Sequence, residues 1–169
     1  MDFIPRIPIN KWTDQAIEYT QLRWGSSLDS FSDFMKSMIE GLQNGLIAIP
    51  PVIFILIVAL IAWKLTNKKV ALFSIVGLLL IENINLWIPT METLAMVIVA
   101  VFWCIIIGVP LGILAGKNLT AHNIITPILD FMQTLPAFVY LLPAVTFFHL
   151  GVVPALIATL IFAVPPVIR

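Results

Sequence analysis

Three polar side chains follow one another at helical spacing inside an apolar stretch in the last third of the chain. In the segment ILDFMQTLPAFVYLLP, residues 128–143, Gln133 and Thr134 stand three and four positions after Asp130. Side chains at these separations share one face of an α-helix. An ionised Asp at the centre of a lipid-exposed helix costs about 2.5–3.5 kcal/mol on insertion scales, so this face must point into protein, a cavity or water. The pattern predicts a polar stripe on a membrane helix.

Two prolines interrupt the same segment. Pro136 cannot donate a hydrogen bond to the carbonyl of residue 132, and Pro143 repeats this defect at residue 139. Non-helical backbone at membrane depth is tolerated only where protein covers it or where it lines a water-filled path. We therefore expect two bends next to the polar stripe. The stripe and the bends either line a transport path or simply hold a helix bundle together.

Aromatic residues gather in this segment and just beyond it. They are Phe131, Phe138, Tyr140, Phe147 and Phe148. Aromatic faces bind quaternary ammonium groups by cation–π attraction. Aromatics in membrane helices also serve as packing groups and interface anchors, and composition alone favours that use. Binding of a quaternary amine is the sharper alternative.

A second motif, GVPLGILAG, lies upstream and places Gly108, Gly112 and Gly116 four residues apart on one helix face. Small residues at this spacing let two helix backbones approach closely in lipid, where packing drives association. Packing is the expected role, and a moving contact in a gated pathway is the alternative. Pro110 removes a backbone hydrogen bond within the motif and predicts a third bend.

Residues suited to catalysis or to metal binding are sparse. His122 and His149 fall at opposite ends of one predicted span, so they cannot share a metal ion, and Cys104 lies in an apolar run as a small core residue. The sequence contains neither a glycine-rich phosphate loop nor a Ser/His/Asp set. We expect no enzymatic activity, no metal and no cofactor in this chain. Because the net charge is zero, the overall charge gives no electrostatic reason to expect nucleic acid as a partner.

The composition specifies the class of protein that must position these residues. Hydrophobic residues make up 60% of the 169 and charged residues 11%, with a mean hydropathy of +1.06. These values are typical of an all-α, polytopic membrane helix bundle. Apolar runs near the 20 residues that cross a bilayer predict five spans. They cover residues 46–63, 70–88, 93–115, 124–148 and 152–168.

The orientation follows from the basic residues in the short connections. Those after the first, third and fifth predicted spans are Lys64, Lys68, Lys69, Lys117 and Arg169. Glu82 and Glu92 lie on the opposite side. We therefore expect the N-terminus outside the cell and Arg169 in the cytoplasm.

Residues 1–44 form an extramembrane arm, and residues 45–169 form the transmembrane domain. Within the arm, apolar residues recur every three or four positions between Leu28 and Leu42, which predicts an amphipathic helix. Ser26 begins it with a capping box, Gly25 ends an earlier helix, and GLQNG, residues 41–45, turns into the first span. The arm either lies in the outer membrane interface or packs on a partner subunit or an external binding protein.

Residues 126–169, TPILDFMQTLPAFVYLLPAVTFFHLGVVPALIATLIFAVPPVIR, resemble the permease subunits of binding-protein-dependent ABC importers for glycine betaine and proline betaine. The resemblance extends more loosely through VPLGILAG and ALFSIVGLLLIE to the N-terminal PRIP. It implies an osmoprotectant importer in a bacterial cytoplasmic membrane, with a permease homodimer among lipids, two ATP-binding subunits and an external substrate-binding protein. ATP would then bind to the partner subunits.

The resemblance implies a longer protein, whereas the residue roles follow from physical reasoning. Such permeases continue into a cytoplasmic loop with a Glu-Ala-Ala motif, so we expect this chain to be truncated before its coupling element. Asp130 would orient the bundle, Gln133 and Thr134 would donate hydrogen bonds between helices, and Pro136 with Pro143 would allow two bends for alternating access. The alternatives are a non-transporting scaffold or regulatory membrane protein, or an importer of choline or carnitine.

Overall fold

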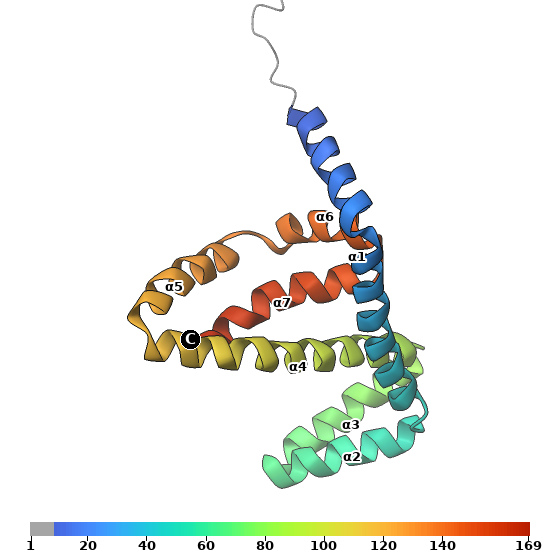
Figure 1. Ribbon diagram of the computed structural model, residues 1–169. Helices are drawn as coiled ribbons and strands as arrows, with labels where there is room; N and C mark the ends of the chain where they lie inside the picture. The colour runs from blue at the N-terminus through green and yellow to red at the C-terminus, as the bar shows by residue number, and fades with distance from the viewer. Residues whose placement is uncertain (1–8) are drawn as a thin grey trace, which may run out of the picture.

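The chain folds into seven helices in the part that the structure describes (Figure 1). The computed structural model describes the backbone of residues 9–169 and the side chains of residues 11–15 and 17–169. The PRIP stretch, residues 5–8, lies outside the described residues. The helices are α1 (Ile9–Ile47), α2 (Pro51–Leu65), α3 (Lys68–Asn83), α4 (Trp87–Lys117), α5 (Leu119–Thr134), α6 (Ala137–Phe148) and α7 (Val152–Ile168). The all-α class predicted from the sequence is confirmed.

α1 is one helix of 39 residues, longer than predicted. It runs through Gly25 and through GLQNG, so the predicted helix end, turn and capping box at Ser26 are all wrong. The Ser26 carbonyl instead accepts a hydrogen bond from Ser30 Oγ at 2.8 Å. Burial is the reason, because Met35 of the predicted apolar stripe and Ile39, which is not part of it, are buried in the core with residues of α4 and α7. This burial outweighs the roughly 1 kcal/mol that each interior glycine costs a helix.

α2 and α3 form an antiparallel hairpin below α4 (Figure 1). The chain leaves α1 through residues 48–50, and α2 is bent by 93° from α1. Pro51 stands in the first turn of α2, where its missing N–H costs nothing. Asn67 caps α3, because its side-chain oxygen accepts a hydrogen bond from the Val70 N–H at 2.9 Å. A buried cluster of Ile55, Trp87 and Met91 joins the hairpin to the start of α4.

α4 and α7 lie side by side at the centre of the fold and share its main core with α1 (Figure 1). Small and β-branched residues make up the α4 side of that core, among them Ala95 and Val99. Leu156 of α7 is fully buried against them. α1 crosses one end of α4, α6 and α7, so the helices of this layer extend away from it in a common direction (Figure 1).

The five predicted apolar ranges fall on α2, α3, α4, the α5–α6 pair and α7. By length and composition, α4 is the one helix among the described residues that can cross a membrane unaided. Counting the bent pairs α1–α2 and α5–α6 as single spans raises the number of candidates to three. α2, α3 and α7 are shorter, at 15, 16 and 17 residues.

Candidate functional site

The fourth predicted span is broken in its middle. α5 ends at Thr134, Leu135 and Pro136 have extended backbone with ψ of 140° and 145°, and α6 begins at Ala137. The axes of α5 and α6 differ by 93°. A residue before proline is biased away from helical backbone, which accounts for the conformation of Leu135. α5 itself begins at a capped end, because Asn118 Oδ1 accepts hydrogen bonds from the N–H groups of Thr120 and Ala121.

Tyr140 bridges the break from the α6 side. Its hydroxyl lies 3.2 Å from the carbonyl oxygen of Phe131 and 3.3 Å from that of Met132. Pro136 has no N–H to donate, so the Met132 carbonyl loses its helical partner. Tyr140 supplies a donor there, and its ring meets Phe162 of α7 edge-on with centroids 6.2 Å apart. The Tyr140 hydroxyl therefore takes the place of the missing N–H at the Met132 carbonyl.

The polar stripe itself lies largely at the surface of the chain. Thr134 Oγ1 donates to the Phe131 carbonyl at 3.0 Å, a bond within α5 where a bond between helices is predicted. Such back-bonding to the preceding turn is usual for helical Thr. Gln133 is exposed. The three residues do share one helix, but the structure brings only Asp130 to another helix.

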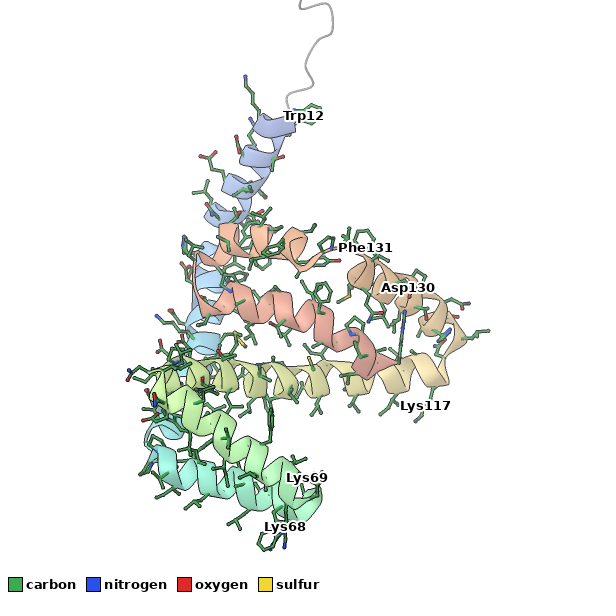
Figure 2. The ribbon with its side chains drawn as sticks, turned by 180° about the vertical axis from the view of Figure 1, so that it is seen from behind. Trp12, Lys68, Lys69, Lys117, Asp130 and Phe131 are labelled. Atoms are coloured by element: carbon green, nitrogen blue, oxygen red, sulfur yellow. The ribbon has the colours of Figure 1, made fainter. Side chains whose placement is uncertain are left out.

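Asp130 of α5 pairs with Arg169, which follows α7 (Figure 2). The two side chains are 58% and 47% exposed, so solvent reaches the pair. Sequence reasoning missed this contact, which joins residues 39 positions apart. A usable signal existed, because both residues are charged, both adjoin apolar spans, and both were assigned to the cytoplasmic half.

Two cavities lie between α4, α5 and α7 on the inner side of the polar stripe. The first has a volume of about 310 Å³ and is lined only by apolar side chains, with Ile128 and Met132 from α5, Ile107 and Leu111 from α4, and Leu160 and Val164 from α7 among them. The second, of about 260 Å³, adjoins it through Leu129 and Ile168. His122, Thr126 and Arg169 give this second cavity a polar wall.

The glycine motif of α4 faces α7, but only in part. A Cβ placed on Gly108 would stand 2.6 Å from Val167 Cγ1, and one on Gly112 would stand 2.9 Å from the backbone oxygen of Ile168. A Cβ on Gly116 would meet nothing within 4 Å. Two of the three glycines thus allow close approach of α4 and the end of α7.

Of the three prolines predicted to bend helices, Pro136 stands at a break between helices. α5 and α6 part at Pro136, whereas α4 is continuous through Pro110 and α6 is continuous through Pro143. A helix packed on its neighbours tolerates an interior proline when that packing offsets the lost hydrogen bond. Pro136 therefore ends a helix, and Pro110 and Pro143 do not; bends at these two residues stay a prediction.

The five aromatic residues do not converge on one point. Phe131 and Phe138 flank the break with 62% and 74% of their surfaces exposed. Phe148 lies at the end of α6, where its ring centroid is 5.9 Å from that of Phe31 in α1. The structure therefore separates the aromatic residues at the break from those that pack α6 on α1.

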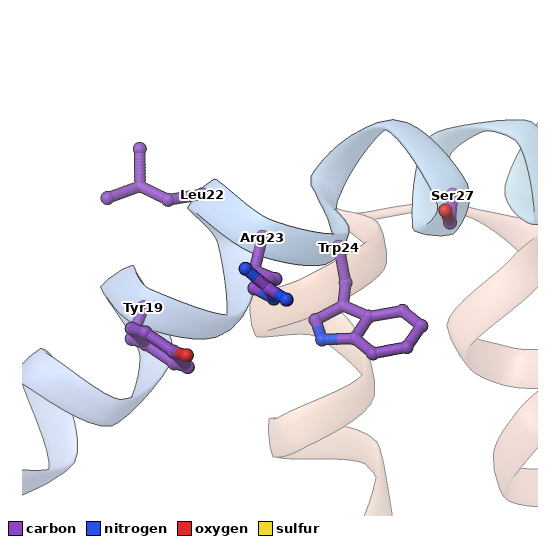
Figure 3. Close-up of a pocket in the computed structure, with 5 residues that line it drawn as sticks. All are labelled: Tyr19, Leu22, Arg23, Trp24 and Ser27. Carbon is purple, nitrogen blue, oxygen red and sulfur yellow. The ribbon is translucent and has the colours of Figure 1, made fainter.

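The remaining candidate features lie elsewhere. His122 is in the first turn of α5 and His149 follows α6, and no group of metal-ligating side chains occurs among the described residues. An open pocket of about 640 Å³ lies along α1, far in the chain from the break (Figure 3). It is lined by Tyr19, Leu22, Arg23, Trp24 and Ser27.

Comparison with known proteins gives a consistent family. Residues 108–169 match the family described as binding-protein-dependent transport system inner membrane component. The whole chain is 43% identical to the glycine betaine transport system permease protein OpuAB of Bacillus subtilis, of which it covers 60%. It is 38% identical, over 96% of its length, to the glycine betaine/proline betaine transport system permease protein ProW of Escherichia coli, covering 46% of that protein.

A third relative is named for a different pair of solutes. The chain is 37% identical over its full length to the glycine betaine/carnitine transport permease protein GbuB of Listeria monocytogenes, and covers 61% of it. The chain thus spans about half to three fifths of the length of these three relatives. These matches confirm the resemblance read from residues 126–169. All three relatives are named as transport permeases, in agreement with the expectation of a non-enzymatic chain.

Proposed function

Because residues 108–169 match the family of inner membrane components of binding-protein-dependent transport systems, we propose that the chain belongs to it and forms the permease of an importer for a quaternary-amine compatible solute. The observation that carries the proposal is the match of all 169 residues to glycine betaine permeases. Accumulating a zwitterion such as glycine betaine protects a cell against osmotic stress. The solute would cross within the membrane part of the permease.

We propose five membrane spans, formed by α2, α3, α4, the α5–α6 pair and α7. The arrangement of charge supports this count. Lys68 and Lys69 at the start of α3 and Lys117 at the end of α4 lie at the ends of these helices remote from α1 (Figure 2). Arg169 ends the chain beside α4 on that same side (Figure 1). A cytoplasmic location of this end satisfies the positive-inside rule.

The same orientation sets α1 on the outer face. We propose residues 1–44 as an extracytoplasmic or interfacial arm and residues 45–169 as the N-terminal part of the permease domain. The 93° angle between α1 and α2 supports the proposal, because it allows α1 to lie along the membrane surface while α2 crosses the membrane. Exposed aromatic side chains on α1, such as Trp12 and Tyr19, suit a membrane interface.

The α5–α6 break is the proposed frame of the translocation path. Broken helices at the membrane midplane commonly form transporter binding sites. In this role Asp130, Gln133 and Thr134 supply polar groups on the cytoplasmic half, while Phe138 and Tyr140 supply aromatic faces beyond the break. The exposed ring of Phe138 is available to a quaternary ammonium group.

The partners follow from the type of system. A binding-protein-dependent ABC importer requires ATP-binding subunits on the cytoplasmic side and an external binding protein. We propose a homodimer of the permease between them, in which ATP binds to the partner subunits alone. Copurification of tagged chain with an ATP-binding subunit is the expected result. Purification of the chain without any ATP-binding subunit would instead favour the second candidate, a membrane scaffold or regulatory protein without transport activity.

The solute class is tested by uptake in a strain that lacks its own osmoprotectant importers. The natural reading frame that contains these residues is expressed with its ATP-binding subunit and binding protein, and uptake of radiolabelled glycine betaine is measured at high osmolarity. Unlabelled proline betaine is expected to compete, and choline and carnitine to compete weakly. Strong competition by carnitine would favour the alternative that the name of the Listeria relative suggests. Absence of uptake with all subunits present would overturn the proposal.

A further inference from the structure

Asp130 and Arg169 make an ion pair between two helices. Two ion pairs occur in the described part of the chain, and the other, Lys36 with Glu40, lies within α1. Asp130 stands in the last turns of α5, and Arg169 follows the last turn of α7. The pair is thus placed to set the distance between α5 and α7.

α5 is otherwise held loosely. Leu129 is its one buried residue, whereas α7 buries five. The apolar cavity of about 310 Å³ separates the inner face of α5 from α4 and α7. Protein interiors are ordinarily close-packed, and a gap of this size removes contacts that would fix a helix in place. The helix therefore has room to move toward its neighbours.

The neighbours of α5 form the fixed reference. Gly108 and Gly112 bring α4 against the end of α7 at distances that leave no space for a Cβ. Val164 and Pro165 of α7 are buried in the same region. Arg169 thus extends from a tightly packed end of α7.

α5 also has a defined pivot. Leu135 and Pro136 interrupt the helical hydrogen bonds between α5 and α6, so rotation there disrupts few backbone bonds. The hydroxyl of Tyr140 contacts the last carbonyl groups of α5 from the other side of this break. α5 is joined to α4 through Asn118 at its start and to α6 through the break at its end, and the ion pair at Asp130 ties it to Arg169.

We propose that Asp130 and Arg169 are positioning residues that act as a latch between α5 and α7. The closed pair fixes the position of α5 relative to the end of α7, and opening it lets α5 turn about the Leu135–Pro136 break. This inference rests on the proposed function in one respect, that the two positions of α5 belong to a transport cycle. The latch itself is a property of the chain and is measurable without transport.

The test uses charge reversal and a distance measurement. Spin labels are attached to cysteines introduced by Ile113→Cys on α4 and Ile124→Cys on α5, two exposed positions. The buried native cysteine is removed by Cys104→Ala. Pulsed electron paramagnetic resonance records the distribution of distances between the two labels in the reconstituted full-length permease. Asp130→Arg and Arg169→Asp each place like charges together and are expected to shift or broaden the distribution. The combined variant, D130R/R169D, restores the opposite charges and is expected to return it to the wild-type form.

Two controls separate the latch from a general effect of charge. Lys36→Glu is expected to leave the distribution unchanged, because its partner Glu40 lies on the same helix and both have exposures close to those of the latch. Asp130→Asn keeps the shape of the side chain and is expected to give a smaller change than Asp130→Arg. These variants remain informative if a charge reversal impairs folding.

The outcomes are distinct. Unchanged distances in Asp130→Asn and in both charge reversals would overturn the latch, as would failure of the combined variant to restore a wild-type distribution. In the complete importer, glycine betaine uptake is expected to fall at least threefold in each charge reversal and to recover to within twofold in the combined variant. Altered distances with no uptake by the wild type would reject the proposed function and leave the latch standing.

Discussion

Two regions on either side of the same cavity are built in opposite ways. α4 and α7 meet through Gly108 and Gly112, where an added Cβ would come within 3 Å of the facing helix. α5 and α6 are joined through Leu135 and Pro136 with a 93° change of direction, and α5 buries a single residue. No space remains for a Cβ at these two glycines, whereas α5 faces a cavity of about 310 Å³.

This difference assigns separate mechanical roles to the two regions. Close-packed helices transmit force and shift little, because any displacement creates overlap or voids. A helix with a break, few buried contacts and an adjacent cavity requires less energy to move. Glycine and proline, the two residues with the strongest backbone effects, thus support opposite behaviour in neighbouring parts of one bundle. Four substitutions test that contrast.

The largest effect is expected from Gly112→Leu. The new side chain would collide with the backbone of Ile168, which cannot rotate away as a side chain can. Overpacking of this kind costs about 1–3 kcal/mol, and we expect the upper end. The free energy of unfolding in a mild detergent measures it. Gly116→Leu is the matched control, because its Cβ has open space, and equal destabilisation by both variants would contradict the tight α4–α7 contact.

Pro136→Ala tests whether this proline causes the break between α5 and α6. Alanine restores an N–H that can bond to the carbonyl of Met132, and so favours one continuous helix from α5 into α6. Spin labels are attached to cysteines introduced by Ile124→Cys and Leu142→Cys. The distance between them is expected to increase toward the roughly 27 Å that 18 residues of straight helix span. Pro143→Ala should leave this distance unchanged, since α6 already continues through Pro143. A longer distance in both variants would mean that the bend does not depend on Pro136.

Asp130→Asn is expected to have a smaller effect, on transport rather than on membrane insertion. Both members of the pair with Arg169 are about half exposed, so their attraction contributes no more than about 1 kcal/mol. Uptake by the complete permease should fall by up to about fivefold, the factor to which that energy corresponds. Membrane fractionation checks insertion in parallel. Uptake at the wild-type rate would make Asp130 dispensable for transport.

The smallest effect is expected from Tyr140→Phe. It removes the hydroxyl that contacts the carbonyl groups of Phe131 and Met132 but keeps the ring against Phe162. The loss of such a hydrogen bond costs about 1 kcal/mol. Hydrogen exchange should accelerate at residues 131–140 and stay unchanged in the exposed Tyr19→Phe control. Identical exchange in both variants would show that the hydroxyl does not stabilise the bend.

Local patterns predicted the helical class and the approximate place of every apolar helix. Hydrophobic composition and the spacing of apolar residues require little tertiary information, and the stripe containing Met35 and Leu42 does pack toward the core. The length of α1 was underestimated because Gly25 and Gly41 are helix-breaking only when tertiary burial does not offset their cost. That burial comes from α4 and α7, more than 50 residues away in the chain.

The site was predicted less completely, for a related reason. Three prolines looked equivalent in the sequence, but α4 and α6 continue through Pro110 and Pro143 while Pro136 separates two helices. Whether a proline ends a helix depends on the residues packed around it, and the spacing of residues in the sequence does not specify that packing. The partner of Asp130 was missed because a contact between distant residues has no local signature. Gly108 and Gly112 were identified from spacing, but their partner α7 was not.

Uptake by a reconstituted importer tests the central claim most directly. The full reading frame containing these residues is reconstituted in liposomes with its ATP-binding subunit and binding protein, and entry of radiolabelled glycine betaine is followed with ATP enclosed on the cytoplasmic side. We expect uptake that requires both ATP and the binding protein. An assembled complex that hydrolyses ATP and moves neither glycine betaine nor a related quaternary amine would contradict it.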